Sequence, residues 1–118
     1  MVEKPIALTL ADADRVIHAV EKAGANVRVG YSRRYKERYL IAKEQISQGR
    51  LGRLVGGAAR VFNLRTQATA ILERNPHATP VVDALTYYVD LMSWLMDSEM
   101  RGVPVREVFA RGQKGVLK

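Results

Sequence analysis

The sequence has no cysteine among its 118 residues, which excludes disulfide bonds and thiolate metal ligands. No apolar run approaches the ~20 residues that a membrane-spanning helix requires, and the amino terminus lacks the pattern of a secretory signal. The glycine-rich fingerprint G-x-G-x-x-G, which seats phosphate groups at a helix amino terminus, is also absent. We therefore expect a cytoplasmic protein with no membrane partner.

Basic residues exceed acidic ones, and the formal net charge is +7. The arginines are scattered, and acidic residues lie among many of them. No run matches a DNA-reading helix or an RNA-binding sheet, so nucleic-acid binding is disfavoured and most of this charge is expected to be solvated. His18 and His77 have no companion ligands at metal spacing, and no metal site is predicted.

The first half of the chain alternates strand and helix signals, which is typical of an α/β or α+β fold. Thr9 is a hydroxyl N-cap for a helix that Gly24 ends, because glycine adopts the left-handed cap without strain. A period of two predicts a strand over residues 26–31. Amphipathic spacing predicts a second helix over residues 35–48, closed by Gly49.

The second half begins with a predicted long strand over residues 54–64. Gly56 and Gly57 lie inside it and indicate a bulge or close packing by a neighbour. Residues 65–79 have no clear period and are expected to form a loop that includes one helical turn. A final strand is predicted over residues 105–110.

Between these segments, Thr79 followed by proline predicts a helix that runs to about residue 96. This helix is apolar nearly all round, so we expect it to be buried on more than one side. Asp83, Tyr87 and Asp90 lie on one stripe of it, at positions i, i+4 and i+7. Because an unpaired buried carboxylate is costly, each aspartate should have a partner, and a structural arginine is favoured for Asp90.

Four short segments, taken together, resemble a known family. Glu3-Lys4-Pro5 is similar to a Glu-Lys-Pro signature, and residues 29–35 (VGYSRRY) to a strand that ends in an aromatic before Arg-aromatic. Residues 46–52 (ISQGRLG) are similar to Ile-x-x-Gly-x-Leu-Gly. The stripe of Asp83, Tyr87 and Asp90 is similar to Asp-x-Gly-x-His-x-x-Asp, with leucine for the glycine and tyrosine for the histidine. These are signatures of the Gfo/Idh/MocA oxidoreductases, and the tyrosine resembles the branch of glucose–fructose oxidoreductase and dihydrodiol dehydrogenase.

The resemblance implies a single α+β (α/β) domain over residues 1–118, in which a mainly antiparallel or mixed sheet is backed by helices. It implies the substrate and oligomerisation part of the family's enzymes, without the nucleotide-binding domain. The parent enzyme would use NAD or NADP on a sugar or polyol. No cofactor is expected to bind this chain alone, which is expected to be inactive by itself.

The resemblance also assigns roles to individual residues. Lys4 would lie between the nicotinamide and the substrate hydroxyl, with Pro5 beside the cofactor. Tyr87 would be the acid/base, and Asp83 would orient Lys4 or the substrate. Arg34 would bind polar groups of the substrate or hold the helix to the sheet. The simpler interpretations are that Lys4 is an exposed lysine and that Tyr87 packs in the core.

A second hypothesis is a non-catalytic module for oligomerisation or protein interaction that keeps this fold. An incomplete sheet leaves strand edges and an apolar face uncovered. On either hypothesis we expect the chain to form a homo-oligomer.

Overall fold

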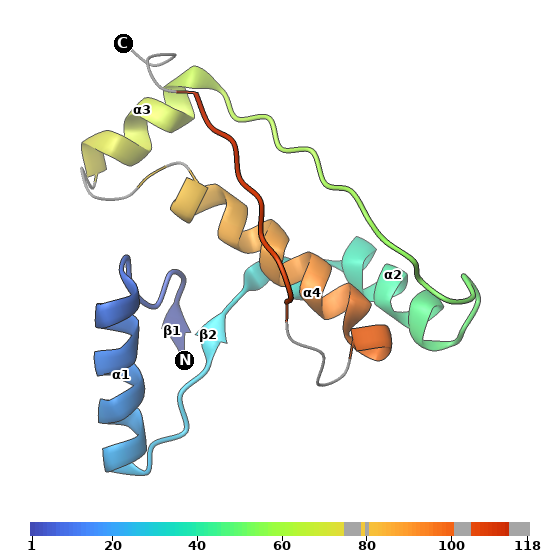
Figure 1. Cartoon of the computed structure of the whole chain (residues 1–118), viewed down its shortest axis with the longest axis horizontal. Helices are drawn as coiled ribbons and strands as arrows, with labels where there is room; N and C mark the ends of the chain where they lie inside the picture. Colours follow the sequence, from blue (N-terminus) through green and yellow to red (C-terminus); the bar gives the residue numbers. More distant parts are fainter. Residues whose placement is uncertain (75–78, 80, 101–104, 114–118) are drawn as a thin grey trace.

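The computed structural model describes residues 1–74, 79, 81–100 and 105–113. Its elements follow one another along the chain as shown in Figure 1. They are β1 (Val2–Glu3), α1 (Leu10–Ala23), β2 (Val29–Gly30), the 3₁₀ turn η1 (Ser32–Tyr35), α2 (Glu37–Ser47), α3 (Arg65–Arg74), the π-helical turn η2 (Val81–Leu85) and α4 (Thr86–Met100).

Helix α1 forms between the two caps that the sequence predicts. The Thr9 hydroxyl accepts a hydrogen bond from the backbone N–H of Asp12 at 3.1 Å, which satisfies one of the free donors of the first turn. Gly24 ends the helix with a φ of 59°, in the left-handed region that glycine reaches without steric cost. Local signals therefore determine this helix, and the prediction is confirmed.

The sheet differs from the prediction. Within the described residues it has two short strands, β1 and β2, which pair in parallel with Val2 opposite Val29 and Glu3 opposite Gly30. The expected antiparallel or mixed sheet is therefore wrong for the described part of the chain. The strand predicted over residues 26–31 is confined to Val29–Gly30, because β1 offers it only two residues of backbone to pair with.

Two further predicted strands are wrong as well. Residues 54–64 and 105–110 belong to no helix or sheet among the described residues. Figure 1 shows the first running from the end of α2 to the start of α3, and the second passing across α4. An alternating pattern reports which side chains favour burial, but a strand also needs a neighbour for its backbone groups.

Glycine in the first of these segments has the packing role that the sequence suggests. A Cβ built on Gly57 would collide with the terminal methyl of Met92 on α4, whereas one on Gly56 would meet nothing. The prediction of close packing is thus confirmed at Gly57 alone.

The segment expected to be a loop contains helix α3, from Arg65 to Arg74. Its residues include several good helix formers, and Ala68 is one of the two buried apolar residues of the described chain, with Leu91. The sequence did not indicate this helix because its apolar periodicity is weak. Tertiary packing at Ala68 contributes to its stability instead. Residues 75–78 of the predicted loop lie outside the described residues.

The predicted helix after Thr79 is confirmed, although its first turn is π-helical and it extends to Met100. The Thr79 hydroxyl accepts from the backbone N–H of Val82 at 3.1 Å; Pro80 lies outside the described residues. Helix α4 packs against α2 and η1, which buries Leu91. Val81, Leu85 and Val89 stay exposed, so the expected burial on more than one side is wrong.

Helix α2 begins at Glu37, later than predicted, because Ser32–Tyr35 first forms the turn η1. Gly49 follows its carboxyl end with a φ of 71°, as its predicted closing role requires.

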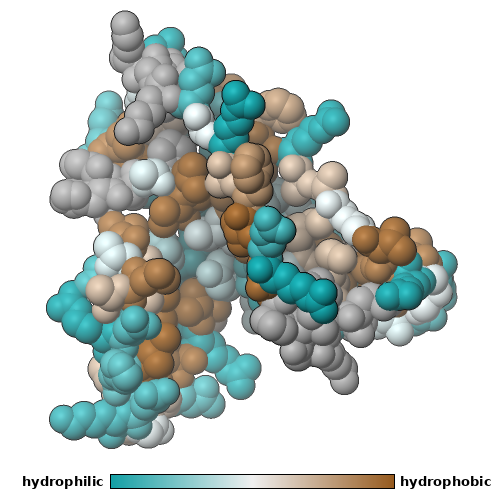
Figure 2. Space-filling model, viewed as in Figure 1, coloured by the Kyte–Doolittle hydropathy of each residue, from teal (hydrophilic) through white to brown (hydrophobic). Residues whose placement is uncertain are grey.

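The arrangement is open. The Cα radius of gyration is 16.7 Å, whereas a compact domain of this length has one of about 13–14 Å. Figure 2 shows apolar side chains reaching the surface on the viewed face over several elements. Among the helices of the described residues, none combines the length and apolarity that crossing a membrane would need.

Candidate functional site

Lys4 follows directly after β1 and turns its side chain inward. The side chain is only 7% exposed. Its ammonium group donates to the backbone carbonyl of Asp83 at 2.7 Å and to Asp83 Oδ1 at 3.1 Å. The interpretation of Lys4 as a merely exposed lysine is therefore wrong: the first strand delivers a nearly buried cation to η2.

Tyr87 lies one helical turn beyond Asp83 and completes this group. The Lys4 Nζ atom is 4.1 Å from the centroid of the Tyr87 ring, within the range of a cation–π contact. Spacing of i and i+4 places Asp83 and Tyr87 on the same face of the helical segment. The structure thus brings together the three residues that the resemblance assigns to catalysis.

These three residues line a cleft of about 470 Å³, which we call the Lys4 cleft. Pro5 and Glu3 line it from the amino-terminal segment, and Arg74 lines it from α3. The cleft lies just beyond the carboxyl end of β1, and ligands of parallel sheets bind outside that edge. Pro5, the second residue expected to contact the cofactor, is therefore in the same cleft as Lys4.

Two arginines that the sequence reasoning did not select also reach this group. Arg74 Nη2 lies 3.3 Å from Asp83 Oδ1. The Arg33 guanidinium carbon lies 4.9 Å from the Tyr87 ring centroid and 4.4 Å from that of Tyr88. Arg33 was visible as part of the VGYSRRY segment, but Arg74 lay in the expected loop and gave no signal.

Arg33 and Arg74 line a second cleft of about 320 Å³, the Arg33 cleft, together with Asp83 and Tyr87. Asn63 and Gln67 add amide groups to its lining. The Lys4 cleft and the Arg33 cleft therefore share Asp83, Tyr87 and Arg74.

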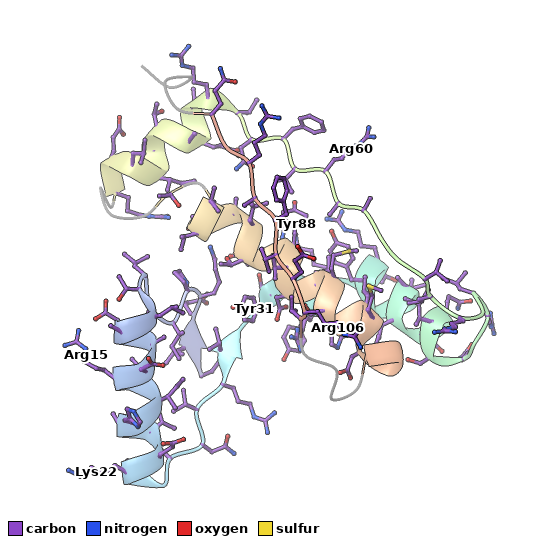
Figure 3. All side chains as sticks on the ribbon, viewed as in Figure 1. Arg15, Lys22, Tyr31, Arg60, Tyr88 and Arg106 are labelled. Carbon is purple, nitrogen blue, oxygen red and sulfur yellow. The ribbon has the colours of Figure 1, made fainter. Side chains whose placement is uncertain are left out.

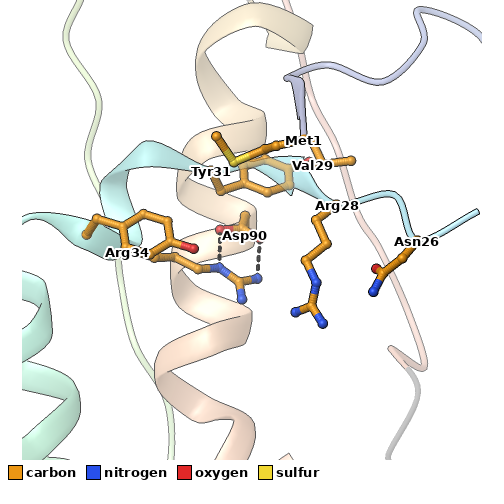
Figure 4. Close-up of a pocket in the computed structure, with 8 residues that line it drawn as sticks. Met1, Asn26, Arg28, Val29, Tyr31, Arg34 and Asp90 are labelled. Atoms are coloured by element: carbon orange, nitrogen blue, oxygen red, sulfur yellow. Dashed lines mark hydrogen bonds and ion pairs between the residues drawn. The ribbon is translucent and has the colours of Figure 1, made fainter.

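Arg34 lies in a different cleft, of about 610 Å³, shown in Figure 4. Its Nε donates to Asp90 Oδ2 at 2.8 Å, and its Nη2 donates to Asp90 Oδ1, so the pair is bidentate. The hydrogen bond to Asp90 raises the pKa of Arg34 above its ordinary value. The structural arginine predicted for Asp90 is therefore present. The role of Arg34 in substrate binding stays a prediction, because Arg34 does not line the cleft of Lys4.

Of the two histidines, His18 alone lies within the described residues. His18 is exposed on α1, with its Nδ1 3.6 Å from Glu21 Oε2, and His77 lies outside the described residues. Over the part of the chain that the structure describes, no group of three or more His, Cys, Asp or Glu side chains could hold a metal ion.

Comparison with known proteins finds relatives that are all inositol 2-dehydrogenases or myo-inositol 2-dehydrogenases among those described next. The chain is 34% identical over 104 residues to the inositol 2-dehydrogenase of Salmonella typhimurium, covering 87% of this chain and 30% of the relative. It is 31% identical over 102 residues to the inositol 2-dehydrogenase of Acidothermus cellulolyticus, covering 86% of this chain and 28% of the relative. It is 28% identical over 120 residues to the myo-inositol 2-dehydrogenase of Thermotoga maritima, covering 93% and 31% respectively.

The chain thus spans about 30% of the length of these relatives. No family model matches it, and no solved structure matches it significantly.

Proposed function

The chain is homologous to a segment of the inositol 2-dehydrogenases of the Gfo/Idh/MocA family, and we propose that it forms the substrate-binding and assembly part of an NAD- or NADP-dependent oxidoreductase that acts on a sugar or polyol. The observation that carries this proposal is the nearly buried ammonium group of Lys4, in contact with both Asp83 and Tyr87 at the edge of a cleft.

Oxidation of a secondary alcohol removes the hydroxyl proton and a hydride from the same carbon, which becomes a carbonyl. NAD or NADP, when bound, accepts the hydride. The proton needs a group within hydrogen-bond reach of the hydroxyl. Tyr87 is the residue proposed for this step: in its phenolate form its oxygen takes the hydroxyl proton and becomes a phenol, and the Lys4 ammonium beside the ring stabilises the negative charge of the phenolate.

Lys4 is proposed to bind the reacting hydroxyl. An ammonium group has three N–H donors, and two of them point to the backbone carbonyl and the carboxylate of Asp83. The third is left for a ligand in the Lys4 cleft. Asp83 fixes the direction of that donor, and Arg74 restrains Asp83 in turn. This is the arrangement expected of a positioned group supported by a second layer of contacts.

The lining of the Lys4 cleft also fits one end of a nicotinamide cofactor. Pro5 offers an apolar ring and Lys4 a cation, and both follow the carboxyl end of a parallel strand. These two residues would hold the nicotinamide end alone, since the sequence has no glycine-rich loop for the pyrophosphate.

The first test measures polyol binding by the purified chain. We expect myo-inositol to shift the NMR signals of the Lys4 ammonium, the Asp83 carboxyl and the Tyr87 ring in a saturable way. Lys4→Met removes the ammonium group that donates a hydrogen bond to the polyol hydroxyl, and it should abolish the shifts at the other two residues. Lys22→Met, which changes a lysine at the far end of α1, should leave them unchanged (Figure 3). Shifts confined to other surfaces would contradict the proposed site.

The second test measures turnover in a chimera in which this chain replaces the matched segment of the Salmonella typhimurium inositol 2-dehydrogenase. Tyr87→Phe removes the proton acceptor, and general acid–base catalysis contributes roughly 10²–10⁴-fold, so turnover should fall by that factor. Tyr35→Phe alters an exposed tyrosine outside the Lys4 cleft and serves as the matched control. Unchanged turnover in Tyr87→Phe would remove Tyr87 from the mechanism.

A further inference from the structure

Arg33 is held at the candidate site with hydrogen-bonding capacity left over. It belongs to η1, which follows β2, and its guanidinium carbon lies 4.4 Å from the Tyr88 ring centroid and 4.9 Å from that of Tyr87. Its Nε atom is buried and has no hydrogen-bond partner among the described residues. The guanidinium lines the Arg33 cleft, so what it offers a ligand is its remaining N–H donors and its positive charge.

The nearest carboxylate is already engaged. Asp83 lines the Arg33 cleft, but its Oδ1 atom is bound by both Lys4 and Arg74. Within the described part of the chain Arg33 forms no ion pair, whereas Arg34, its neighbour, is paired with Asp90. Three cations therefore converge on Asp83 and Tyr87, and the charge of Arg33 is the one without a counter-ion in the described residues.

From this arrangement we infer that the site takes an anionic polyol, a sugar acid whose carboxylate binds Arg33 while a neighbouring hydroxyl lies at Lys4 and Tyr87. The inference rests on the proposed function and narrows its substrate class. A planar guanidinium matches a carboxylate with two parallel hydrogen bonds. A neutral polyol would leave the charge of Arg33 without a counter-ion in this half-buried position, whereas a carboxylate supplies one.

The geometry favours Arg33 over Arg74 for this role. Arg74 is 69% exposed and spends one donor on Asp83, so solvent screens most of its charge. Arg33 is half-buried and lies against two aromatic rings, which fix the plane of its guanidinium before a ligand arrives. Asn63 and Gln67 offer donors and acceptors for further hydroxyl groups in the Arg33 cleft.

The test compares two sugars that differ in one group. The purified chain is titrated with D-glucuronate and with D-glucose at constant ionic strength, and binding is followed by the NMR signals of Arg33 Nε–H, Lys4 Nζ and the Tyr87 ring. A charge-assisted pair strengthens binding by about 1.5–3 kcal/mol, so we expect D-glucuronate to bind roughly 10- to 100-fold more tightly than D-glucose. The Arg33 Nε–H signal should show the largest shift.

Variants assign the effect to one side chain. Arg33→Gln should abolish the preference for D-glucuronate while the response to myo-inositol at Lys4 persists. Arg33→Lys keeps the charge without the fork and should retain an intermediate preference. Arg60→Gln removes a positive charge from the segment between α2 and α3, where Arg60 points away from the helices (Figure 3), and should change nothing. Two-dimensional NMR spectra establish that each variant is folded.

The possible failures are separable. Equal binding of both sugars with shifts at Lys4 and Tyr87 would overturn the anionic class and leave the proposed function standing. A D-glucuronate preference that survives in Arg33→Gln would overturn the role of Arg33. If D-glucuronate, D-glucose and myo-inositol all fail to shift the signals of Lys4 and Tyr87, the proposed function itself is contradicted. The inference built on it then falls as well.

Discussion

Arg34 and Asp90 connect the turn η1 to the second turn of α4, and their 56-position separation makes the pair a tertiary rather than a local contact. The Asp90 side chain is 10% exposed, and both of its oxygens accept from the guanidinium. Helix α4 is thereby fixed relative to the loop that also carries Arg33. A nearly buried carboxylate with a single bidentate partner is expensive to leave alone.

Replacing Arg34 with methionine should therefore destabilise the fold. The substitution keeps much of the aliphatic packing but leaves Asp90 without its partner, and we expect a loss of about 2–3 kcal/mol in the free energy of unfolding. Urea denaturation followed by circular dichroism measures this loss. Adding Asp90→Leu to Arg34→Met removes the orphaned charge and should recover part of the stability. A wild-type midpoint in Arg34→Met would instead mean that the pair does not hold α4.

Acid should weaken the first turn of α1. The hydrogen bond from Arg15, followed by that from the Thr9 hydroxyl, lowers the pKa of Asp12 below its ordinary value of 3.8. A carboxyl whose pKa is lower in the folded than in the unfolded state adds stability above the unfolded value, and this contribution is lost as the pH falls through the folded value. An NMR titration of the Asp12 carboxyl should give a midpoint below 3.8.

The variant Arg15→Gln checks the cause. Arg15 lies on the outer face of α1, so its loss should leave the helix intact (Figure 3). The Asp12 midpoint should then move back towards its ordinary value, with only the Thr9 hydroxyl still lowering it. A midpoint that does not move in Arg15→Gln would contradict this assignment.

Gly57 should tolerate alanine only because Met92 can move. The added Cβ meets the flexible end of the Met92 side chain, which can take another rotamer at small cost, so Gly57→Ala should change stability by less than about 1 kcal/mol. Gly57→Leu needs more room and should cost about 1–3 kcal/mol by overpacking. Met92→Ala in the same chain should offset part of that loss. Purely additive effects in a double-mutant cycle would show that the two residues do not touch.

Self-association remains our expectation for this chain, and the helical segment formed by η2 and α4 offers a surface for it. Val81, Leu85 and Val89 are exposed at spacings of four along one face. An exposed apolar stripe of this kind marks an interaction surface. We expect light scattering at micromolar concentration to report a dimer or larger species, and Val89→Lys to shift it towards the monomer. A monodisperse monomer before any substitution would count against this expectation.

The predictions that succeeded depended on short-range signals. Thr9 and Gly24 bound α1 through contacts within a few residues, and the helix after Thr79 was evident from its start signal and apolar run. The strands over 54–64 and 105–110 failed because pairing depends on a neighbour that local alternation cannot reveal. Whether either segment would join a sheet therefore could not be derived from its own sequence.

The candidate site was predictable only in part, and for a related reason. Lys4, Asp83 and Tyr87 were selected by resemblance to motifs, and nothing in their local patterns says that they meet. Arg33 and Arg74 escaped because η1 and α3 bring them in through tertiary packing. In segments with weak periodicity, the sequence does not predict which cleft a charged side chain will line.

The contact between Lys4 and Asp83 spans 79 positions of the chain. Closing so large a loop costs entropy, which the pairing of β1 with β2 and the Arg34–Asp90 pair help to offset, so we expect the cleft to be absent from a short peptide and to form late in folding. Its formation should coincide with the slowest step in the appearance of native structure. The NMR signal of the Tyr87 ring, which is sensitive to the ammonium group beside it, would then report when that step occurs. A single cut of the backbone between Lys4 and Asp83 should prevent the step.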